Sequence, residues 1–445
     1  MDADLDLAGS PVLTRLDLRG AGGHVRGRLP RPGSGGPAPI EAVREILATV
    51  REGGDAAVLR YTEQFDGVTL QGLWVPEREI DDALRSTPPE LRRALEEARD
   101  SIAAFHADQM PPPRRYERDG IVVDEFTRPV DRAGAYVPGG RARYPSTVLM
   151  TVVPARVAGV PEVILCVPPE TGSGGRVAQS TLAAAALAGA DEVFSCGGVQ
   201  AVAAMAYGTE TIPAVDIVVG PGNAYVATAK REVAAQGVVG TPSAFAGPSE
   251  VVVVADDTSD VEAAAIDVVV QAEHGPDGLA WLVTWSDDAA DRISEAVARL
   301  VQESPRRADL ESTLGDGGYA AVVEGPEHAM AVVNEIAPEH LELMNAEPEA
   351  LVPLVRHAGA VFCGPWAPAA VGDYIAGPSH VLPTFRSARF SSGLRVDDFL
   401  RHLHTITLDE DAMARVAPHV AALAEAEGLP AHGQAVRVRT GSRAR

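Results

Sequence analysis

The feature that most constrains the fold is a repeated alternation of short apolar segments with longer segments of helical period, which begins at residue 136. The apolar segments have the length of β-strands. They cover residues 163–167, 192–195, 215–219, 251–255, 280–285, 320–323 and 360–362. Strands that alternate with helices form parallel βαβ units, so the sequence predicts an α/β fold.

The alternation is interrupted by the loop at residues 245–249, FAGPS. We therefore expect two α/β units with a cleft between them, where folds of this kind tend to bind ligands. Before the alternation we expect an amphipathic helix from about Ile40 and a second helix over residues 89–105. Residues 22–39 are rich in Gly, Pro and Arg and are typical of a linker. The residues after 395 have a mostly helical pattern and are too few for a core of their own.

The net charge, the apolar segments and the cysteine content limit the kinds of partner and the cellular location that we expect. The 445 residues carry a formal net charge of -24, which disfavours nucleic acid and anionic membrane surfaces as partners. No apolar run is long enough for a transmembrane helix, and the acidic N-terminus has no secretory pattern. The three cysteines are too few and too scattered for a disulfide framework or a thiolate zinc site. We expect a cytoplasmic protein.

The helix predicted over residues 259–273 ends in the sequence QAEHG. Gln271 and His274 are three residues apart, so both side chains project from one face of the last turn. An amide oxygen and an imidazole nitrogen presented together suit a divalent metal such as zinc. Taken alone, the pair is more often an ordinary helix end that is capped by Gly275 and carries solvated side chains.

Further polar residues stand in segments punctuated by Gly and Pro, where the backbone holds side chains in place. They are Ser249 in AGPSE, Glu339 and His340 in APEHL, Asp373 in GDY, His380 in GPSH, and Glu427 and His432 in AEAEGLPAHG. Each is a weak signal by itself, because turn residues, solvated carboxylates and histidines at the edge of a core give the same pattern.

Together, these clusters resemble one family in their order and approximate spacing. The chain resembles the histidinol dehydrogenases, zinc enzymes of the last steps of histidine biosynthesis, from about Ile40 to about Val436. The blocks that carry the resemblance are GAYVPGG, YPSTVLMT, CGGVQA, VGPGN, AGPSE, QAEHGPD, APEHLEL, GDY with GPSHVLPT, ARFSSGL and EGLPAH. The resemblance implies an α/β fold of two incomplete Rossmann-like domains, with a short N-terminal arm and a helical C-terminal tail.

The resemblance also implies an activity: oxidation of L-histidinol through L-histidinal to L-histidine, by two successive hydride transfers to NAD. It implies one zinc ion per subunit, for which manganese or cobalt can substitute. The positions that match the metal ligands are Gln271, His274, Asp373 and His432. The positions that match substrate contacts are Ser249, His340, His380 and Glu427, together with the four metal ligands.

Glu339 and His340 match the family's catalytic pair. Alcohol oxidation needs a base for the hydroxyl proton, for which a histidine is suited, and the second oxidation needs a group such as Glu339 to activate water. The positions that match NAD contacts are Tyr136, Gln200 and Asn223. The sequence has no G-x-G-x-x-G after a strand, the usual dinucleotide fingerprint, and the family's incomplete domains bind NAD without it.

The resemblance divides the chain into four parts. Residues 1–37 would form an N-terminal arm and linker, and residues 38–135 and 247–394 a first α/β domain with the metal and catalytic residues. Residues 136–246 would form the NAD-binding domain and residues 395–445 a dimerisation tail. The tail would cross to a partner, so that a homodimer would have composite active sites, each completed by His432 of the other chain.

Other functions remain open on the sequence alone. A relative that oxidises another small polar alcohol would be expected to lose Glu427 or His380, and both are present. A catalytically idle binding protein would be expected to lose the pair at residues 339–340 or the metal ligands, which are also present. A third route, through a thiohemiacetal on Cys196, is disfavoured because no basic residue adjoins this cysteine in the sequence.

Overall fold

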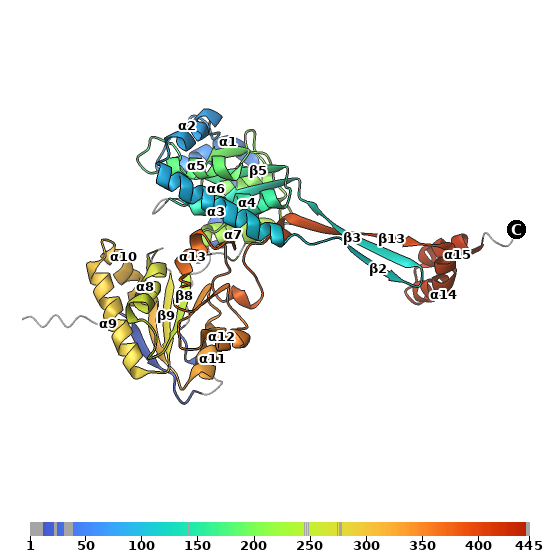
Figure 1. Ribbon diagram of the computed structural model, residues 1–445. Helices are drawn as coiled ribbons and strands as arrows, with labels where there is room; N and C mark the ends of the chain where they lie inside the picture. Colours follow the sequence, from blue (N-terminus) through green and yellow to red (C-terminus); the bar gives the residue numbers. More distant parts are fainter. Residues whose placement is uncertain are drawn as a thin grey trace, which may run out of the picture.

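The structure is a computed structural model. It describes residues 12–21, 25–30, 39–139, 143–243, 245, 247, 249–273, 275 and 278–441. The chain forms two α/β domains and a long arm that extends to one side of them (Figure 1). The parallel sheets with helices on both faces confirm the predicted α/β class.

The upper domain in Figure 1, called the four-stranded domain, contains a parallel sheet in the order β6-β5-β4-β7. Its strands are β4 (Arg132–Tyr136), β5 (Glu162–Val167), β6 (Glu192–Ser195) and β7 (Ile217–Val219). β4 pairs with β5 on one side and with β7 on the other. The strand order therefore reverses at β4, and the carboxyl end of such a strand is where open α/β sheets bind ligands.

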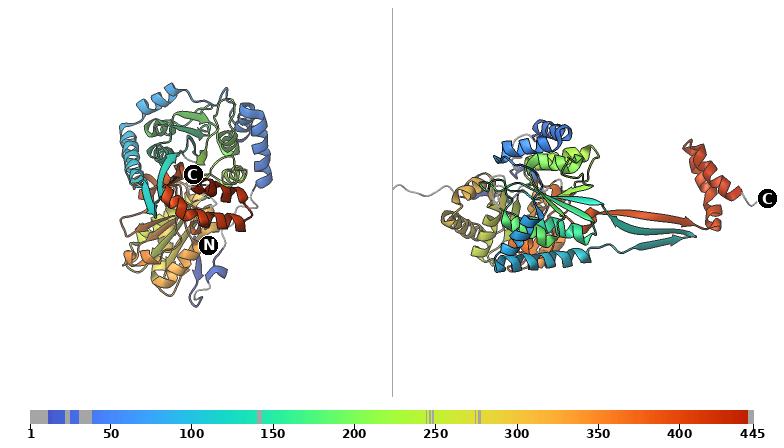
Figure 2. Two further views of the ribbon diagram at one scale, coloured as in Figure 1. Left: turned by 90° about the vertical axis from the view of Figure 1, so that its right-hand side faces the viewer. Right: turned by 90° about the horizontal axis from the view of Figure 1, so that it is seen from above.

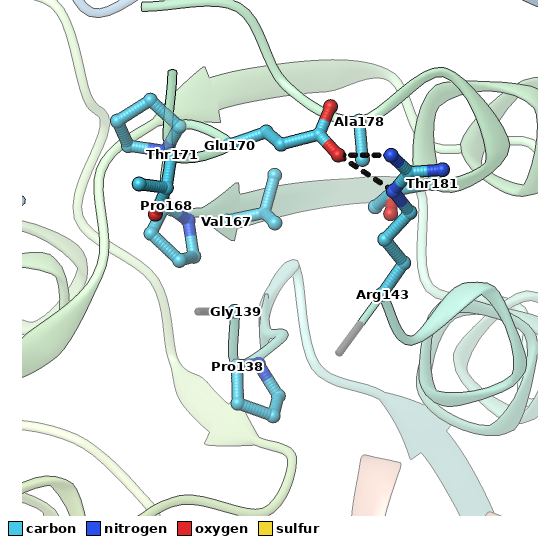
Figure 3. Close-up of a pocket in the computed structure, with 10 residues that line it drawn as sticks. Pro138, Gly139, Arg143, Val167, Pro168, Glu170, Thr171, Ala178 and Thr181 are labelled. Atoms are coloured by element: carbon cyan, nitrogen blue, oxygen red, sulfur yellow. Dashed lines mark hydrogen bonds and ion pairs between the residues drawn. The ribbon is translucent and has the colours of Figure 1, made fainter. Parts of the chain in front are cut away.

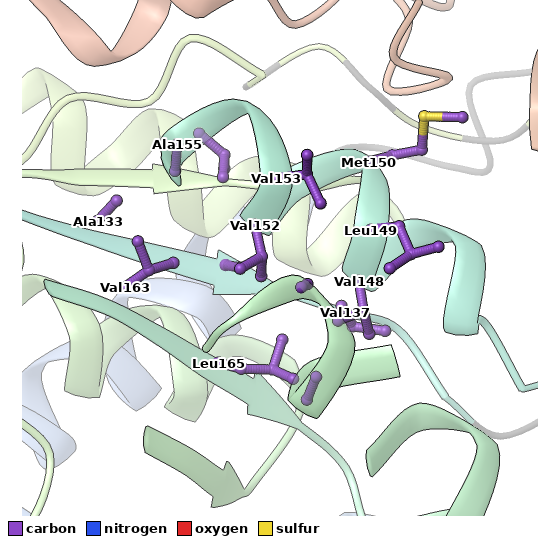
Figure 4. Close-up of a cluster of buried hydrophobic side chains, with 14 of the residues drawn as sticks. Ala133, Val137, Val148, Leu149, Met150, Val152, Val153, Ala155, Val163 and Leu165 are labelled. Atoms are coloured by element: carbon purple, nitrogen blue, oxygen red, sulfur yellow. The ribbon is translucent and has the colours of Figure 1, made fainter. Parts of the chain in front are cut away.

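Helices cover both faces of this sheet. One face carries α4 (Pro145–Val157) and α5 (Gln179–Ala188), with α2 (Glu77–Ser86) and α3 (Pro89–Asp108) packed against them. The other face carries α1 (Ile40–Asp66), α6 (Gly198–Tyr207) and α7 (Ala224–Ala235). Figure 4 shows the core of the first face, where apolar residues of α4 lie against β4 and β5.

The lower domain, called the six-stranded domain, contains a parallel sheet in the order β1-β10-β9-β8-β11-β12. The strands are β1 (Thr14–Asp17), β8 (Glu250–Ala255), β9 (Leu279–Thr284), β10 (Gly318–Val322), β11 (His340–Leu343) and β12 (Ala360–Cys363). One face carries α8 (Val261–Ala272), α9 (Asp287–Glu303) and α10 (Arg307–Gly317), and the other carries α11 (Pro326–Ile336) and α12 (Pro348–Leu351). A short helix, α13 (Ala369–Tyr374), follows β12.

The arm is an antiparallel sheet in the order β13-β3-β2, built from β2 (Arg114–Arg118), β3 (Ile121–Pro129) and β13 (Leu400–Leu408). At its far end α14 (Glu410–Ala426) and α15 (Pro430–Thr440) pack on each other, well away from both domains (Figures 1 and 2). Large apolar side chains remain exposed along the arm and tail, namely Tyr116, Leu403, Ile406, Leu423, Leu429 and Val438. One chain therefore leaves much apolar surface of its tail uncovered.

The predicted domain division is wrong in its grouping of residues 38–135 with residues 247–394. The predicted apolar face of α1 does form, and it buries Val43, Ile46, Leu47 and Val50. This face packs in one core with α6 and α7 of the four-stranded domain, and β4 is an inner strand of that domain. Helical periodicity identifies an apolar face, but not the sheet that the face will cover.

The two ends of the chain also differ from the prediction. Part of the expected N-terminal arm, residues 14–17, is an edge strand of the six-stranded sheet. The expected helical tail is helical over residues 410–440, but residues 400–408 form β13. Among the described helices, none combines the length and the apolar character needed to cross a membrane.

Candidate active site

The predicted catalytic pair lies at the amino-terminal edge of the six-stranded sheet. His340 is the first residue of β11, and Glu339 directly precedes it. β11 runs between β8 and β12, with His340 in register with Val251 and Ala360. Glu250, the first residue of β8, is therefore brought beside the pair.

His340 is only 3% exposed and has partners around its ring. Nδ1–H donates a hydrogen bond to the carbonyl oxygen of Glu250 (3.2 Å), and Nδ1 also lies 3.4 Å from Oε2 of Glu339. On the other side, Nε2 lies 3.4 Å from Oδ1 of Asp373, and the ring stacks on Phe362. Because a carbonyl can only accept, Nδ1 carries a proton, which leaves Nε2 as the nitrogen available for proton exchange.

Burial and the neighbouring carboxylates shift the pKa of His340 in opposite directions. Burial lowers the pKa of His340, but the negative charge of Glu339 and hydrogen bonds with Asp373 and Glu339 outweigh this effect. The pKa of His340 therefore lies well above its usual value in the ligand-free chain.

The backbone of Glu250 holds both members of the pair. Its N–H donates to Oε2 of Glu339 (2.9 Å), while its carbonyl accepts from His340. The side chain of Glu250 is buried as well, and its Oε1 accepts from the backbone N–H of Phe385 (2.9 Å). Burial, with a contribution from the charge of Glu339, raises the pKa of Glu250 to about 8. Our sequence analysis missed Glu250, whose only signal is a carboxylate at the start of an otherwise apolar strand.

This raised pKa predicts a pH dependence of stability. Glu250 takes up a proton at a higher pH in the folded chain than its ordinary value of 4.5. Its contribution to stability is therefore complete below pH 4.5 and is lost as the pH rises through about 8. Glu250→Gln should flatten the fall in the free energy of unfolding between pH 5 and 9, at most by about 1.4 kcal/mol per pH unit. Urea unfolding at a series of pH values measures this.

A matched control for this prediction is Glu295→Gln, which alters an exposed carboxylate on α9. This variant should follow the wild-type pH profile. Parallel profiles for Glu250→Gln and the wild-type protein would show instead that Glu250 is ionised in the fold.

The turn that carries Phe385 is strained. Phe385 and Arg386 have φ of 51° and 66°, in the left-handed region that bulky residues rarely adopt. The turn is held by the bond from Phe385 to Glu250 and by Thr384, which donates from its backbone N–H to the carbonyl of Phe245 (3.1 Å) and accepts from Gly247 (3.0 Å). Strain of this kind persists where the surroundings over-determine it, often beside a functional site.

Gln271 lies in the last turn of α8, as predicted, and is 1% exposed. Within the described part of the chain, neither its amide oxygen nor its amide nitrogen has a hydrogen-bond partner. An unsatisfied buried amide costs free energy unless a ligand completes it. His274, the second residue of the predicted pair, lies outside the described residues.

A buried pair of carboxyl groups aligns α8 with α13. Asp267 on α8 is hydrogen-bonded to Glu342 on β11, and Glu342 also accepts from the backbone N–H of Ala369 at the start of α13 (3.0 Å). Burial and the bond with Asp267 raise the pKa of Glu342 to about 9, so the pair shares a proton. Gln271 and Asp373 each lie four residues, about one turn, beyond these anchors.

The charges around Tyr374, at the end of α13, also indicate that the ends of α8 and α13 lie near each other. Burial raises the pKa of Tyr374, and the charges of Asp373 and of Glu273 both add to the increase. The end of α13 is thus within electrostatic range of the end of α8, which carries Gln271. Our sequence analysis missed the carboxyl pair, because nothing local distinguishes a buried Asp or Glu from a solvated one.

The predicted substrate residues Ser249 and His380 lie near the junction of the two domains. Ser249 directly precedes β8. His380 Nδ1 contacts the carbonyl oxygen of Asp373 (2.9 Å), and Nε2 contacts the hydroxyl of Thr147 on α4 (3.0 Å). The neighbouring Ser379 donates to the carbonyl of Met150, also on α4 (3.1 Å). The loop beside Asp373 is therefore fastened to the four-stranded domain.

The remaining two predicted residues are not brought to this site. Glu427 and His432 are exposed, at the end of α14 and in α15. Figures 1 and 2 show both helices at the far end of the arm. Among the described residues, no three His, Cys, Asp or Glu side chains form a group that could hold a metal ion. Of the predicted metal ligands that the structure describes, Gln271 and Asp373 belong to the body of the chain, whereas His432 belongs to the distant helix α15. One chain therefore does not bring these three ligands together.

The three positions predicted for NAD lie at the carboxyl edge of the four-stranded sheet. Tyr136 ends β4, and its buried hydroxyl accepts from the backbone N–H of Gly198 (3.2 Å). Gln200 is buried in the first turn of α6, and its Oε1 has no partner among the described residues. Asn223 is exposed and caps α7 through hydrogen bonds from two backbone N–H groups.

A cavity of about 410 Å³ opens at the same edge, beyond the ends of β4 and β5 (Figure 3). Its polar lining includes Glu170, which accepts a hydrogen bond from Arg143 (2.6 Å). The volume falls within the range of small-molecule sites. Our sequence analysis did not single out either residue.

These features define a class of protein: an α/β protein with a buried carboxylate–imidazole pair in one domain and a cavity at the carboxyl edge of the sheet in the other. The family model described as histidinol dehydrogenase matches residues 31–440. The chain belongs to the histidinol dehydrogenase family.

Individual relatives agree with this assignment. The histidinol dehydrogenase of Parasynechococcus marenigrum is 49% identical over 395 residues, which are 88% of this chain and 89% of that protein. The histidinol dehydrogenase of Gluconobacter oxydans is 46% identical over 432 residues, 96% of this chain and 99% of the relative. The crystal structure of histidinol dehydrogenase from Elizabethkingia anophelis superposes with a TM-score of 0.92 at 32% identity, and covers 98% of this chain and 99% of its own.

Proposed function

We propose that this chain oxidises L-histidinol through L-histidinal to L-histidine, with NAD as the hydride acceptor, in cytoplasmic histidine biosynthesis. Membership of the histidinol dehydrogenase family supports this assignment. The observation that carries it is the Glu339–His340 pair, which is buried, held by the backbone of Glu250, and adjacent to Asp373.

In the first oxidation, Nε2 of His340 takes the proton of the substrate hydroxyl, while the hydride from the same carbon leaves to NAD. The contact from Nδ1–H to the carbonyl of Glu250 supports this role, because it keeps the proton of the neutral ring on Nδ1. Nε2 can then accept a proton once a bound metal neutralises Asp373, whose charge otherwise keeps the ring protonated. The products of this step are the aldehyde, NADH and a proton.

In the second oxidation, water adds to the aldehyde to form a hydrate, which gives up a second hydride and yields the carboxylate. Glu339 is our candidate for activating this water. Its burial and its bond from the N–H of Glu250 fix the carboxylate beside His340, so one site serves both steps.

We propose that Gln271, His274 and Asp373, with His432 of a partner subunit, hold one zinc ion, which manganese or cobalt can replace. Amide and carboxylate oxygens with imidazole nitrogens suit this metal, and the unsatisfied amide of Gln271 fits a ligand role. Bound zinc would orient the nitrogen atoms of histidinol and neutralise Asp373 beside His340.

For the substrate we propose contacts from Ser249, His380 and, across the dimer, Glu427, in addition to the metal ligands. The bonds of His380 to Thr147 and to the backbone of Asp373 support its placement at the domain junction. For NAD we propose Tyr136, Gln200 and Asn223, at the sheet edge where such folds bind dinucleotides. The homodimer itself is supported by the exposed apolar residues of the arm and tail.

The test of the activity is direct. Purified full-length protein, loaded with zinc, should form two molecules of NADH for each molecule of histidine produced from L-histidinol. A protein that reduces NAD with other small polar alcohols but not with histidinol would belong to the alternative, a relative with another substrate. A protein inactive with every alcohol tested would be the non-catalytic alternative.

The first prediction under this proposal concerns the metal. A strong chelator should abolish activity, and added zinc or manganese should restore it, because the metal orients the substrate. His274→Asn should lower the metal content measured by elemental analysis, as well as turnover. Cys363→Ser is the control: it removes a partly exposed thiol outside the proposed ligand set and should leave the metal content unchanged. Full activity in a metal-free sample would contradict the assignment.

The second prediction separates the two oxidations. Glu339→Gln keeps the shape and an oxygen that can accept from Glu250, but it removes the base. It should slow the oxidation of supplied histidinal roughly 10²-fold or more, and the first oxidation less. Single-turnover kinetics with each substrate measures the two steps separately. Equal losses in both steps would mean that Glu339 only positions His340.

A further inference from the structure

One buried basic residue has no part in the mechanism described above. Lys230, on α7, is the only lysine among the 445 residues; the other 37 basic residues are arginines. It is also completely buried, with 0% of its side chain exposed. Of the 38 lysine and arginine residues, the chain therefore has lysine only at one position, which is closed to solvent.

The ammonium group of Lys230 joins two loops. Nζ donates to the carbonyl oxygen of Gly220 (2.7 Å) and to the carbonyl oxygen of Ser243. The hydroxyl of Ser243 in turn accepts from the backbone N–H of Gly220 (3.0 Å). Lys230 thus bonds the carbonyl oxygen of Gly220, and Ser243 bonds its N–H.

The properties of an amine explain why arginine does not replace it. Burial lowers the pKa of Lys230 to about 7, and the like charge of Arg231 adds to this effect. An amine that gives up its proton can still donate to both carbonyls, whereas a guanidinium is larger, planar and always charged. The site therefore suits lysine specifically. None of the described carboxylates pairs with this group, and a buried lysine can lose its unpaired charge, whereas an arginine would have to keep it.

Gly220 begins the loop that carries Asn223. Its φ is 112°, and a Cβ at this position would lie 2.0 Å from the carbonyl oxygen of Tyr136. The loop backbone therefore lies directly against the backbone of one proposed NAD residue and ends at another, Asn223, which caps α7. Any movement of Gly220 would be transmitted to both.

Ser243 begins the segment that returns to the six-stranded domain. Two residues later, the carbonyl of Phe245 accepts from the backbone N–H and the hydroxyl of Thr384 (3.1 Å and 3.0 Å). Thr384 precedes the strained turn whose Phe385 donates to Glu250. Lys230 thus fastens the loop of Asn223 to the segment that leads to the catalytic pair.

We propose that Lys230 is a positioning residue for the dinucleotide: it locks the loop Gly220–Asn223 to Ser243 in the form that binds NAD. This inference rests on the proposed binding of NAD at Tyr136 and Asn223. Lys230 acts through the loop and does not itself touch the cofactor.

The first test compares variants that separate volume from hydrogen bonding. Lys230→Met keeps the length of the side chain and removes the donor, whereas Lys230→Gln keeps a neutral donor. Lys230→Met should weaken NAD binding, measured by calorimetry without substrate, at least about tenfold, because two buried carbonyls lose their donor. Lys230→Gln should fall between Lys230→Met and the wild-type protein.

The kinetic pattern distinguishes positioning from general damage to the fold. In Lys230→Met the KM for NAD should rise by the same factor as the dissociation constant, while kcat stays within about threefold and the KM for histidinol is unchanged. Arg231→Met alters the neighbouring exposed residue and is the matched control, with NAD binding within twofold of wild type.

A second measurement needs no substitution, because a single lysine gives a single signal. Protein grown with lysine that is labelled with ¹³C only at Cε should show one resonance, which shifts on addition of NAD. NAD binding within twofold of wild type in Lys230→Met would overturn the proposal. If that variant does not fold, an unmoved lysine resonance at saturating NAD would overturn it. Failure of the wild-type protein to bind NAD at all would instead refute the proposed function.

Discussion

Mixing an inactive His432→Ala protein with an inactive His274→Ala protein, under conditions of subunit exchange, is expected to restore activity. Random exchange makes half of the dimers mixed, and each mixed dimer has one site with both lesions and one intact site, so about a quarter of wild-type activity should return. Steady-state assays of the mixture, with each parent alone as a blank, measure this.

The reason for this expectation is the placement of the tail. His432 belongs to α15, and Figures 1 and 2 show α15 at the far end of the arm, away from α8 and α13, the helices that contain Gln271 and Asp373. α14 and α15 bury few residues against each other and leave Leu423 and Val438 more than half exposed. A tail without a core of its own gains stability by covering such surface on a partner, at about 25 cal/mol per Å² of apolar area.

A matched mixture tests the geometry. His274→Ala and Asp373→Ala both alter the part of the site that one chain would supply from its body. Every site of their mixed dimer keeps one lesion, so this mixture should stay inactive. Recovery in this control, or no recovery with His432→Ala despite proven exchange, would contradict a site shared between subunits.

The sequence allowed most of the body of the fold to be predicted, because strands buried on both faces are short apolar runs and helices have periodic apolar faces. β5, β6, β8 and α8 all lie within a few residues of their predicted positions. The arm was missed: β2, RRYER, is exposed along its whole length and has no apolar alternation to mark it. β2 pairs only with its neighbour in the chain, β3, whereas the other pairing of the arm, between β3 and β13, joins residues more than 270 positions apart.

Some residues of the candidate site could be predicted from the sequence, and others could not. Glu339, His340 and Asp373 were predicted through the resemblance to the family, and the structure brings these three together. Glu250 and Lys230 were missed, because the sequence does not show which carboxylate or amine is buried. Their burial follows from strand pairing and from loop contacts, which no local pattern encodes.

The remaining prediction contrasts an acid–base route with a thiol route. His340→Ala should reduce the overall oxidation roughly 10²–10⁴-fold, the usual effect of losing a positioned base, while the protein still folds and binds zinc. Cys196→Ala should retain most of the activity. Both are measured as kcat with zinc-loaded protein of known metal content.

The structure supplies the physical reason. Cys196 is fully buried in the core beneath α6, in the domain that does not carry His340. The hydrogen bond with Cys166 and burial together raise the pKa of the Cys196 thiol well above its usual value, so it stays protonated. A thiohemiacetal requires a thiolate that can reach the aldehyde, and this thiol meets neither requirement. A Cys196→Ala protein that folds, binds zinc and oxidises neither histidinol nor histidinal would overturn the acid–base assignment.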